Sequence, residues 1–268
     1  MKNITQVMNQ CPSGSVWTAA DVGVVNPTIE CAQPCPSGYE PLDQVLPGGG
    51  WQPGQMQEVL HGSVAGADVP LVAPVLVRRQ REAMQGAQSQ WAGTVVLVNP
   101  VHTPFTPAWG AWGLDTSRLV WLHPERPQAC AWAVEQALQC ADVVAVLAWL
   151  PQAHALALRR IQYLAAQSEA LLWVFRPQAC RTQSSPAPLR LVVDVDASDM
   201  HRPALRVEML KRRGLPHTGV LHLPWQHHAL GEALQAQQQW VNQRRTEMQE
   251  WQDEYAALDG ASAIKQAA

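Results

Sequence analysis

The chain has 268 residues, 47% of them apolar, and a formal net charge of −3. This length suffices for one large domain or two small ones with a full core, and the slightly negative charge argues against a protein that coats nucleic acid indiscriminately. The six cysteines are too sparse and too irregular in spacing for a disulfide framework. No apolar leader opens the chain, and the longest apolar run, 143–150, is far shorter than a membrane span. We therefore expect a protein of a reducing cytoplasm.

Residues 1–35 are rich in Pro, Ser, Gly and Cys without periodicity, which predicts an extended N-terminal arm. From residue 36 the pattern becomes regular, and Asp68 is placed to cap a helix that tolerates Pro70 in its first turn. Alternation of strands and helices of this length predicts an α/β domain, with a mostly parallel sheet covered by helices on both faces. The predicted strands are 57–60, 94–98, 119–122, 143–150 and 171–175, and the predicted helices are 68–85, 107–113, 126–140 and 153–168.

After Pro186 the pattern changes to strands joined by short polar connections. The segments 189–196, 205–210 and 220–223 predict an antiparallel extension of the sheet. From about 228 to 258 the chain is rich in Ala, Gln, Glu and Arg, which predicts a long C-terminal helix followed by a frayed tail. The expected organisation is therefore an arm (1–35), an α/β core (36–225) and a C-terminal helix with its tail (226–268).

The segment after the first predicted strand has the layout of a phosphate-binding loop but lacks its chemistry. A working loop has glycine, four residues, a second glycine, lysine and then serine or threonine. Counted from Gly62, through Ser63 and Gly66, the lysine position holds Asp68 and the hydroxyl position holds Val69. An anion thus replaces the cation that would meet the phosphates, and an aliphatic side chain replaces the magnesium ligand.

Two further positions that serve ATP hydrolysis in such a fold also lack an acid. The central apolar strand ends at Trp149-Leu150 without a carboxylate to hold magnesium. The segment after the second strand reads Val98-Asn99-Pro100-Val101-His102, again without an acid that could activate water. Together these losses predict a protein that is not an ATPase. The loop itself is either a plain strand-to-helix turn or a residual nucleotide site that uses backbone amides, and the sequence leaves both open.

Residues 151–225 carry more Lys and Arg than Asp and Glu, in contrast to the segments before and after them. Within this stretch, Lys211, Arg212 and Arg213 end a predicted strand, and Arg176 comes from a neighbouring segment. Such a run is often only a solvated turn. The functional alternative is a contact with DNA phosphates or with an acidic partner.

Neither the cysteines nor the histidines indicate a metal site. Cys31 and Cys35 are not followed by a second pair of ligands, and the histidines around 217–228 straddle a turn without a carboxylate or cysteine nearby. We expect no metal and no bound cofactor.

The predicted C-terminal helix carries an apolar stripe at helical spacing. This stripe either packs on its own domain or offers a groove-binding or coiled-coil surface to a partner. The residues we assign to a partner-binding surface are Leu234, Trp240, Val241, Arg244, Met248, Trp251 and Tyr255.

Twelve tryptophans are many for this length. Four of them, Trp121, Trp132, Trp149 and Trp173, lie in predicted strands or helices and are expected in the core. A second group lies beside Gly or Pro in connecting segments and predicts an exposed patch: Trp51, Trp109 and Trp112.

Over residues 36–224 the chain resembles the RecA-like ImuA family, proteins associated with translesion DNA synthesis. The resemblance implies a RecA-type core, encoded in a bacterial operon that DNA damage (the SOS response) induces. It implies work with ImuB, a catalytically inactive relative of Y-family polymerases, in mutagenic lesion bypass. The motifs that carry it are Pro-Gly-Gly-Gly-Trp (47–51), the strand 143–151, Leu-Arg-Arg-Ile-Gln (158–162), Phe-Arg-Pro (175–177), 185–191, and Leu-Lys-Arg-Arg-Gly (210–214).

Further candidate partners are RecA, an error-prone DnaE-type polymerase, DNA and a second copy of the chain. A rival within the same superfamily is a SulA-type division inhibitor that binds FtsZ, but such proteins are shorter and lack a full series of strand–helix–strand units. A second rival is an active RecA-like ATPase, which the losses at Asp68, Val69, Val101 and the acid-free strand end Trp149-Leu150 oppose. A downstream gene for an inactive Y-family polymerase would support the adaptor over the division inhibitor. An ATPase assay tests for the active ATPase.

Overall fold

A computed structural model describes residues 33–62, 67–85, 89–196, 204–224 and Arg244. The chain divides into two units, 1–225 and 226–268, and the second contributes only Arg244 to the described residues. Residues 1–32 of the predicted arm (1–35), and the predicted C-terminal helix apart from Arg244, therefore lie outside the described part. None of the described helices has the length and apolarity needed to cross a lipid bilayer.

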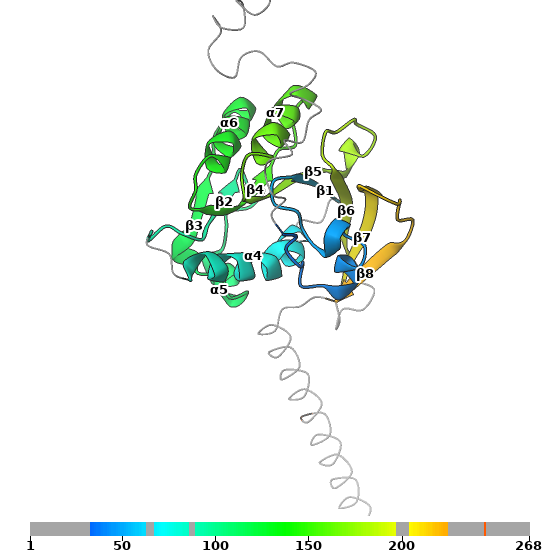
Figure 1. The fold of residues 1–268 in the computed structure, drawn as a ribbon, viewed down its shortest axis with the longest axis horizontal. Coiled ribbons are helices and arrows are strands. Elements are labelled where there is room, and N and C mark those ends of the chain that lie inside the picture. The colour runs from blue at the N-terminus through cyan, green and yellow to red at the C-terminus, as the bar shows by residue number, and fades with distance from the viewer. Residues whose placement is uncertain (1–32, 63–66, 86–88, 197–203, 225–243, 245–268) are drawn as a thin grey trace, which may run out of the picture. The chain divides into compact units, whose positions relative to one another are not determined.

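The described residues form one eight-stranded sheet in the order β3-β2-β4-β5-β1-β6-β7-β8 (Figure 1). The strands β1 to β6 run parallel, and β7 and β8 continue the sheet antiparallel. The predicted α/β class and mostly parallel sheet are thus confirmed. The strands are β1 (Met56–His61), β2 (Thr94–Val98), β3 (Leu119–Leu122), β4 (Val143–Trp149), β5 (Leu171–Pro177), β6 (Leu189–Asp196), β7 (Ala204–Lys211) and β8 (Val220–Pro224).

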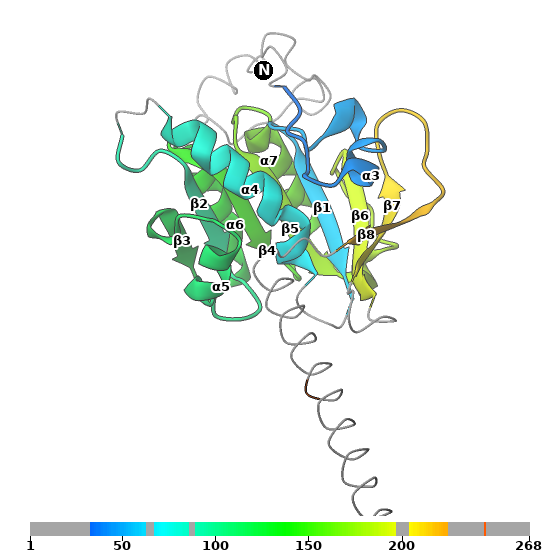
Figure 2. The ribbon, with the colours of Figure 1, turned by 90° about the horizontal axis from the view of Figure 1, so that it is seen from below.

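Helices cover both faces of the sheet, as the alternation of strands and helices predicts (Figures 1 and 2). On one face, α3 (Glu40–Asp43), α4 (Asp68–Met84) and α5 (Thr106–Ala111) enclose the larger hydrophobic core. On the other face, α6 (Pro127–Leu138) and α7 (Ala155–Ala165) pack on a second core. All seven residues of β4 are buried, as expected for an apolar strand between two helical layers.

The prediction of an antiparallel extension beginning at residue 189 is wrong for its first strand. β6 pairs in parallel with β1, and only β7 and β8 run antiparallel. The connection from β5 to β6 contains only a short 3-10 turn, η3 (Gln178–Cys180), where a parallel crossover usually contains an α-helix. The sequence therefore lacked the helical pattern that normally marks such a crossover.

The glycine-rich motif at 47–51 has a structural role at the start of the core. Trp51 is fully buried against Trp173, with ring centroids 5.5 Å apart and near-perpendicular planes. Its backbone exchanges two hydrogen bonds of 2.7 Å with Cys35, which ties the end of the predicted arm to the core. Gly50 lies so close to the Cys35 carbonyl that a side chain there would overlap it.

The tryptophans are distributed differently from the prediction. Trp149 and Trp173 are buried as expected, but Trp51 and Trp109 are buried as well and do not form an exposed patch. Conversely, Trp121 and Trp132 are 46% and 60% exposed, because they lie on the edge strand β3 and on the outer side of α6.

Candidate functional site at the carboxyl edge of the sheet

The candidate site lies where the parallel strands end, because α/β proteins bind ligands outside the carboxyl ends of their strands. This edge gathers the three positions at which the sequence lacks catalytic residues: Asp68 after β1, Asn99 after β2 and Trp149 at the end of β4.

Asp68 does not cap α4, contrary to the prediction. The N-cap is Ala67, and Asp68 is the first residue of the helix, only 7% exposed. Its carboxylate oxygen Oδ2 accepts a hydrogen bond of 2.7 Å from the indole Nε1 of Trp149. The start of a helix favours an anion, and here the chain's own carboxylate occupies that place.

Trp149 links the ends of three strands. Its ring stacks on Phe175 of β5, with centroids 4.8 Å apart and planes 21° from parallel. Its carbonyl accepts a bond of 3.1 Å from the side-chain amide of Asn99, whose own backbone N–H donates to the carbonyl of Leu122 at 2.8 Å. Asn99 has a φ of 52°, the only positive φ among the described non-glycine residues, so a strained backbone holds this amide in place.

The structure therefore joins the three altered positions into one bonded group, which we call the Trp149 network: Asp68, Asn99, Trp149 and Phe175. Phosphoryl transfer requires a cation at the phosphates and a carboxylate for magnesium. The network offers a buried anion, an indole and an amide, and their hydrogen-bonding groups face one another. The sequence predicted that these three positions lack catalytic groups. It did not predict that the residues at these positions contact one another.

A second carboxylate lies beside the start of the loop. Asp194 of β6 packs so tightly against Gly62 that a side chain at Gly62 would overlap it, and its nearest ion-pair partner, Arg206, is 4.0 Å away. Ser63 and Gly66 of the predicted loop lie outside the described residues. The described flanks of the loop thus present carboxylates, which oppose the binding of a phosphate.

Arg176 is not part of an exposed basic surface, which corrects its predicted role as a contact to DNA or to an acidic partner. The residue is 3% exposed, and its Nη1 bonds Glu58 of β1 at 2.9 Å. Arg190 of β6 bonds the other oxygen of the same carboxylate at 2.6 Å. Glu58, Arg176 and Arg190 thus form a buried ion triad across three adjacent strands. The sequence does carry one signal of this triad, a glutamate in the middle of an apolar strand. The arginines that neutralise it come from two other strands.

The triad also positions the loops at the carboxyl edge. Arg176 donates to the carbonyl of Ala153 at 3.1 Å and to the side chain of Gln183 at 2.9 Å, and Arg190 donates to the carbonyl of Cys180 at 3.1 Å. One buried carboxylate therefore fixes the connections that follow β4 and β5.

The basic run lies at the opposite edge of the sheet from the Trp149 network, because Lys211 is paired with Arg190 near the start of β6. Lys211 donates to the carbonyl of Ser185 at 3.1 Å, and Arg212 donates to the carbonyl of Val45 at 2.5 Å. Arg213 is exposed and makes no side-chain hydrogen bond within the described part of the chain. Two of the three cations thus hold the β7–β8 connection to neighbouring segments.

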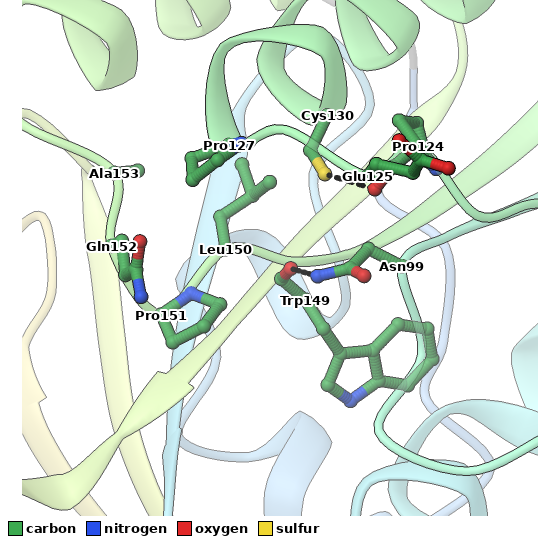
Figure 3. Close-up of a pocket in the computed structure, with 10 residues that line it drawn as sticks. All are labelled: Asn99, Pro124, Glu125, Pro127, Cys130, Trp149, Leu150, Pro151, Gln152 and Ala153. Carbon is green, nitrogen blue, oxygen red and sulfur yellow. Dashed lines mark hydrogen bonds between the residues drawn. The ribbon is translucent and has the colours of Figure 1, made fainter.

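A cavity of about 270 Å³ opens at the carboxyl ends of β2 and β4 (Figure 3). The helices that follow these two neighbouring strands, α5 and α7, lie on opposite faces of the sheet, and such a switch point is the usual place of a ligand crevice. The lining residues are Asn99, Pro124, Glu125, Pro127, Cys130, Trp149, Leu150, Pro151, Gln152 and Ala153.

The chemistry of this cavity does not suit phosphate or nucleophilic catalysis. Among its lining residues Glu125 is the single carboxylate, and there is no lysine or arginine. Burial raises the pKa of the Cys130 thiol, whose Sγ donates to the carbonyl of Pro124 at 3.6 Å, so the thiol remains protonated and a weak nucleophile. The cavity is suited to a small neutral or cationic group.

Most of the predicted partner-binding helix lies outside the described residues: Leu234, Trp240, Val241, Met248, Trp251 and Tyr255. Arg244 alone is described, and it is helical and exposed. Within the described ranges, no group of three or more His, Cys, Asp or Glu side chains is placed to hold a metal ion. No protein-family model matches the chain, and no curated protein matches it.

We expect Trp149→Phe to destabilise the protein by about 2–3 kcal/mol, because it removes a donor to a buried carboxylate while it keeps an aromatic ring on Phe175. Urea unfolding measures this change. The matched control is Trp132→Phe at an exposed tryptophan, for which we expect a change below about 0.5 kcal/mol. Equal losses of stability in the two variants would show that the hydrogen bond from the indole N–H of Trp149 does not stabilise the fold.

We expect Glu58→Gln to cost about 3–5 kcal/mol, because it leaves two buried guanidinium groups without their counter-ion. The control is Glu208→Gln, which removes the solvent-open ion pair with Arg181 and is expected to change stability far less. Chemical unfolding of both variants at neutral pH makes the comparison, and a stability of Glu58→Gln close to that of the control would contradict the role of the triad.

Proposed function

We propose that this chain is a non-catalytic, RecA-like adaptor in error-prone translesion DNA synthesis after DNA damage, and that it binds an ImuB-type relative of the Y-family polymerases. The proposal joins the sequence resemblance over 36–224 to a mostly parallel α/β sheet, and to a segment between β1 and α4 whose sequence has the layout of a phosphate-binding loop. It treats the chain as a binding protein that retains the framework of a nucleotide enzyme.

The observation that carries the non-catalytic part is the Trp149 network. The positions expected to hold the phosphate-binding lysine and the magnesium-binding acid are occupied by Asp68 and Trp149, which bond each other at 2.7 Å. Restoring either catalytic residue would therefore break this hydrogen bond. This arrangement supports a chain that neither hydrolyses ATP nor holds it.

Two surfaces are proposed for the partners. Lys211 and Arg213 are exposed and remain candidates for DNA or an acidic partner, whereas Arg212 acts mainly through its bond to Val45. The apolar stripe of residues 226–268 is proposed to meet the polymerase relative, because large aromatic side chains such as Trp251 and Tyr255 often dominate interface energies. RecA and a DnaE-type polymerase complete the proposed set of partners.

We expect the full chain to co-purify with an ImuB-type protein, and we expect the double substitution Trp251→Ala with Tyr255→Ala to weaken this association by at least about tenfold. A matched control is Leu156→Ala, at an exposed apolar residue of α7. Affinity is measured by titration of the labelled partner.

If Leu156→Ala loses binding and the double variant does not, the binding surface lies on the α/β core rather than on residues 226–268. Binding to an FtsZ-type protein, together with no binding to the polymerase relative, would contradict the adaptor and support a division inhibitor.

A further inference from the structure

The cavity at the carboxyl ends of β2 and β4 offers a ligand few free backbone donors. Three of its lining residues are prolines, which have no N–H: Pro124, Pro127 and Pro151. The N–H of Leu150 donates to the carbonyl of Phe175 at 3.0 Å, and the N–H of Ala153 donates to the carbonyl of Leu150 at 3.3 Å. The N–H groups of Asn99 and Cys130 are bonded to backbone carbonyls in the same way.

The side chains of the lining leave mainly acceptors. Asn99 and Cys130 already direct donors to the carbonyls of Trp149 and Pro124, as the dashed lines in Figure 3 show. The carboxylate of Glu125 is exposed and makes no hydrogen bond or ion pair within the described part of the chain. A ligand in this cavity therefore meets one negative charge and a surplus of hydrogen-bond acceptors.

Two helices begin beside the cavity, and the start of a helix favours a negative charge. At the start of α7, the imidazole Nδ1 of His154 already accepts the N–H of Ala157 at 3.1 Å. At the start of α6, the acid is Glu125 itself, two residues before Pro127. Groups of the chain thus already serve both helix starts, so that the charge of Glu125 calls for a cation.

The walls and the size of the cavity restrict what such a cation can be. Leu150, Ala153 and the three prolines make the walls largely apolar, and apolar walls favour an aliphatic stem. The volume of about 270 Å³ lies just below the range of about 300–1,000 Å³ that is typical of pockets for drug-sized ligands. The cavity therefore has room for a short stem with one charged end.

We propose that this cavity binds an ammonium group on a short aliphatic stem, with Glu125 as its counter-ion. An ammonium group has three N–H donors and no acceptor, which matches a lining rich in acceptors. The group is carried either by a small free amine or by a lysine side chain of another protein, and the chemistry of recognition is the same. This inference does not depend on the proposed function in lesion bypass.

Titration of the isotope-labelled full chain with n-butylamine, followed by nuclear magnetic resonance, tests the site. The protonated amine has the four-carbon stem of lysine. We expect a saturable shift of the side-chain amide signal of Asn99, which lines the cavity. The controls are n-butanol and butyrate, which keep the stem but carry a neutral or a negative end, and both are expected to bind more weakly.

Glu125→Gln is expected to raise the dissociation constant of n-butylamine at least about fivefold, because it removes the counter-ion but keeps the shape of the side chain. The matched control is Glu169→Gln, at an exposed acid two residues before β5 and hence at the opposite edge of the sheet, and it is expected to bind normally. Ala153→Leu fills the cavity and is expected to abolish the shift.

Three results would overturn the proposal: no saturable shift with n-butylamine, equal or tighter binding of n-butanol or butyrate, or unchanged affinity in Glu125→Gln. Glu125 is exposed, so its substitution leaves the fold intact and the test valid even if Ala153→Leu is unstable. Thermal unfolding of both variants verifies that they are folded.

A pair of short capped peptides, Leu-Lys-Leu and its analogue with norleucine in place of lysine, identifies the source of the ammonium group. Binding of the lysine peptide at least about tenfold tighter than n-butylamine, with no binding of the norleucine peptide, assigns the site to a protein lysine. Binding of n-butylamine without binding of the lysine peptide assigns it to a free amine. Equal binding of the two peptides would show that the ammonium group is not recognised and would contradict the proposal.

Discussion

The hydrogen bond between the indole of Trp149 and the carboxylate of Asp68 constrains the whole carboxyl edge of the sheet. A carboxylate that is 7% exposed needs a hydrogen-bond donor, and the indole of Trp149 supplies one. The Trp149 carbonyl also accepts a hydrogen bond from the side-chain amide of Asn99. The ends of β2 and β4 are therefore fixed to each other and to the start of α4. A ligand with phosphates at this edge would meet the carboxylates of Asp68 and of Asp194 beside Gly62.

The buried triad holds the loops at the same edge from inside the sheet. In a nucleotide enzyme, bound phosphate and metal help to hold the loops that follow the strands. In this chain Glu58, with Arg176 and Arg190, holds the loops after β4 and β5 through hydrogen bonds to backbone carbonyls. Buried ion pairs contribute little net stability compared with apolar packing, but they are costly to disrupt and they specify geometry. The edge is therefore organised from inside the sheet.

The parts of the fold that could be predicted are those that local pattern determines. Strands β2 and β3 were predicted residue for residue, since continuous β-branched and apolar runs define them. The direction of β6 could not be predicted, because it depends on a crossover without a helix. The exposure of Trp121 also escaped prediction, since an edge position follows from strand order rather than from the strand's own sequence.

The sequence predicted which catalytic residues the candidate site lacks, but not how the residues that replace them are arranged. Asp68, Trp149 and the segment that contains Asn99 were identified as departures from a catalytic pattern. The contact between Asp68 and Trp149, however, spans 81 positions and is a property of the folded sheet. Arg176 was misassigned for the same reason, since its partner Glu58 lies 118 positions earlier in the chain.

The central proposal, that this edge neither binds nor hydrolyses a nucleotide, is tested most directly by titrating the full chain with magnesium and ATP in a calorimeter. Phosphate release is measured in the same samples with single-stranded DNA present. The Trp149 network predicts no saturable heat of binding and no phosphate above the buffer level. Saturable binding with DNA-stimulated phosphate release that disappears on substitution of Gly62 would contradict it.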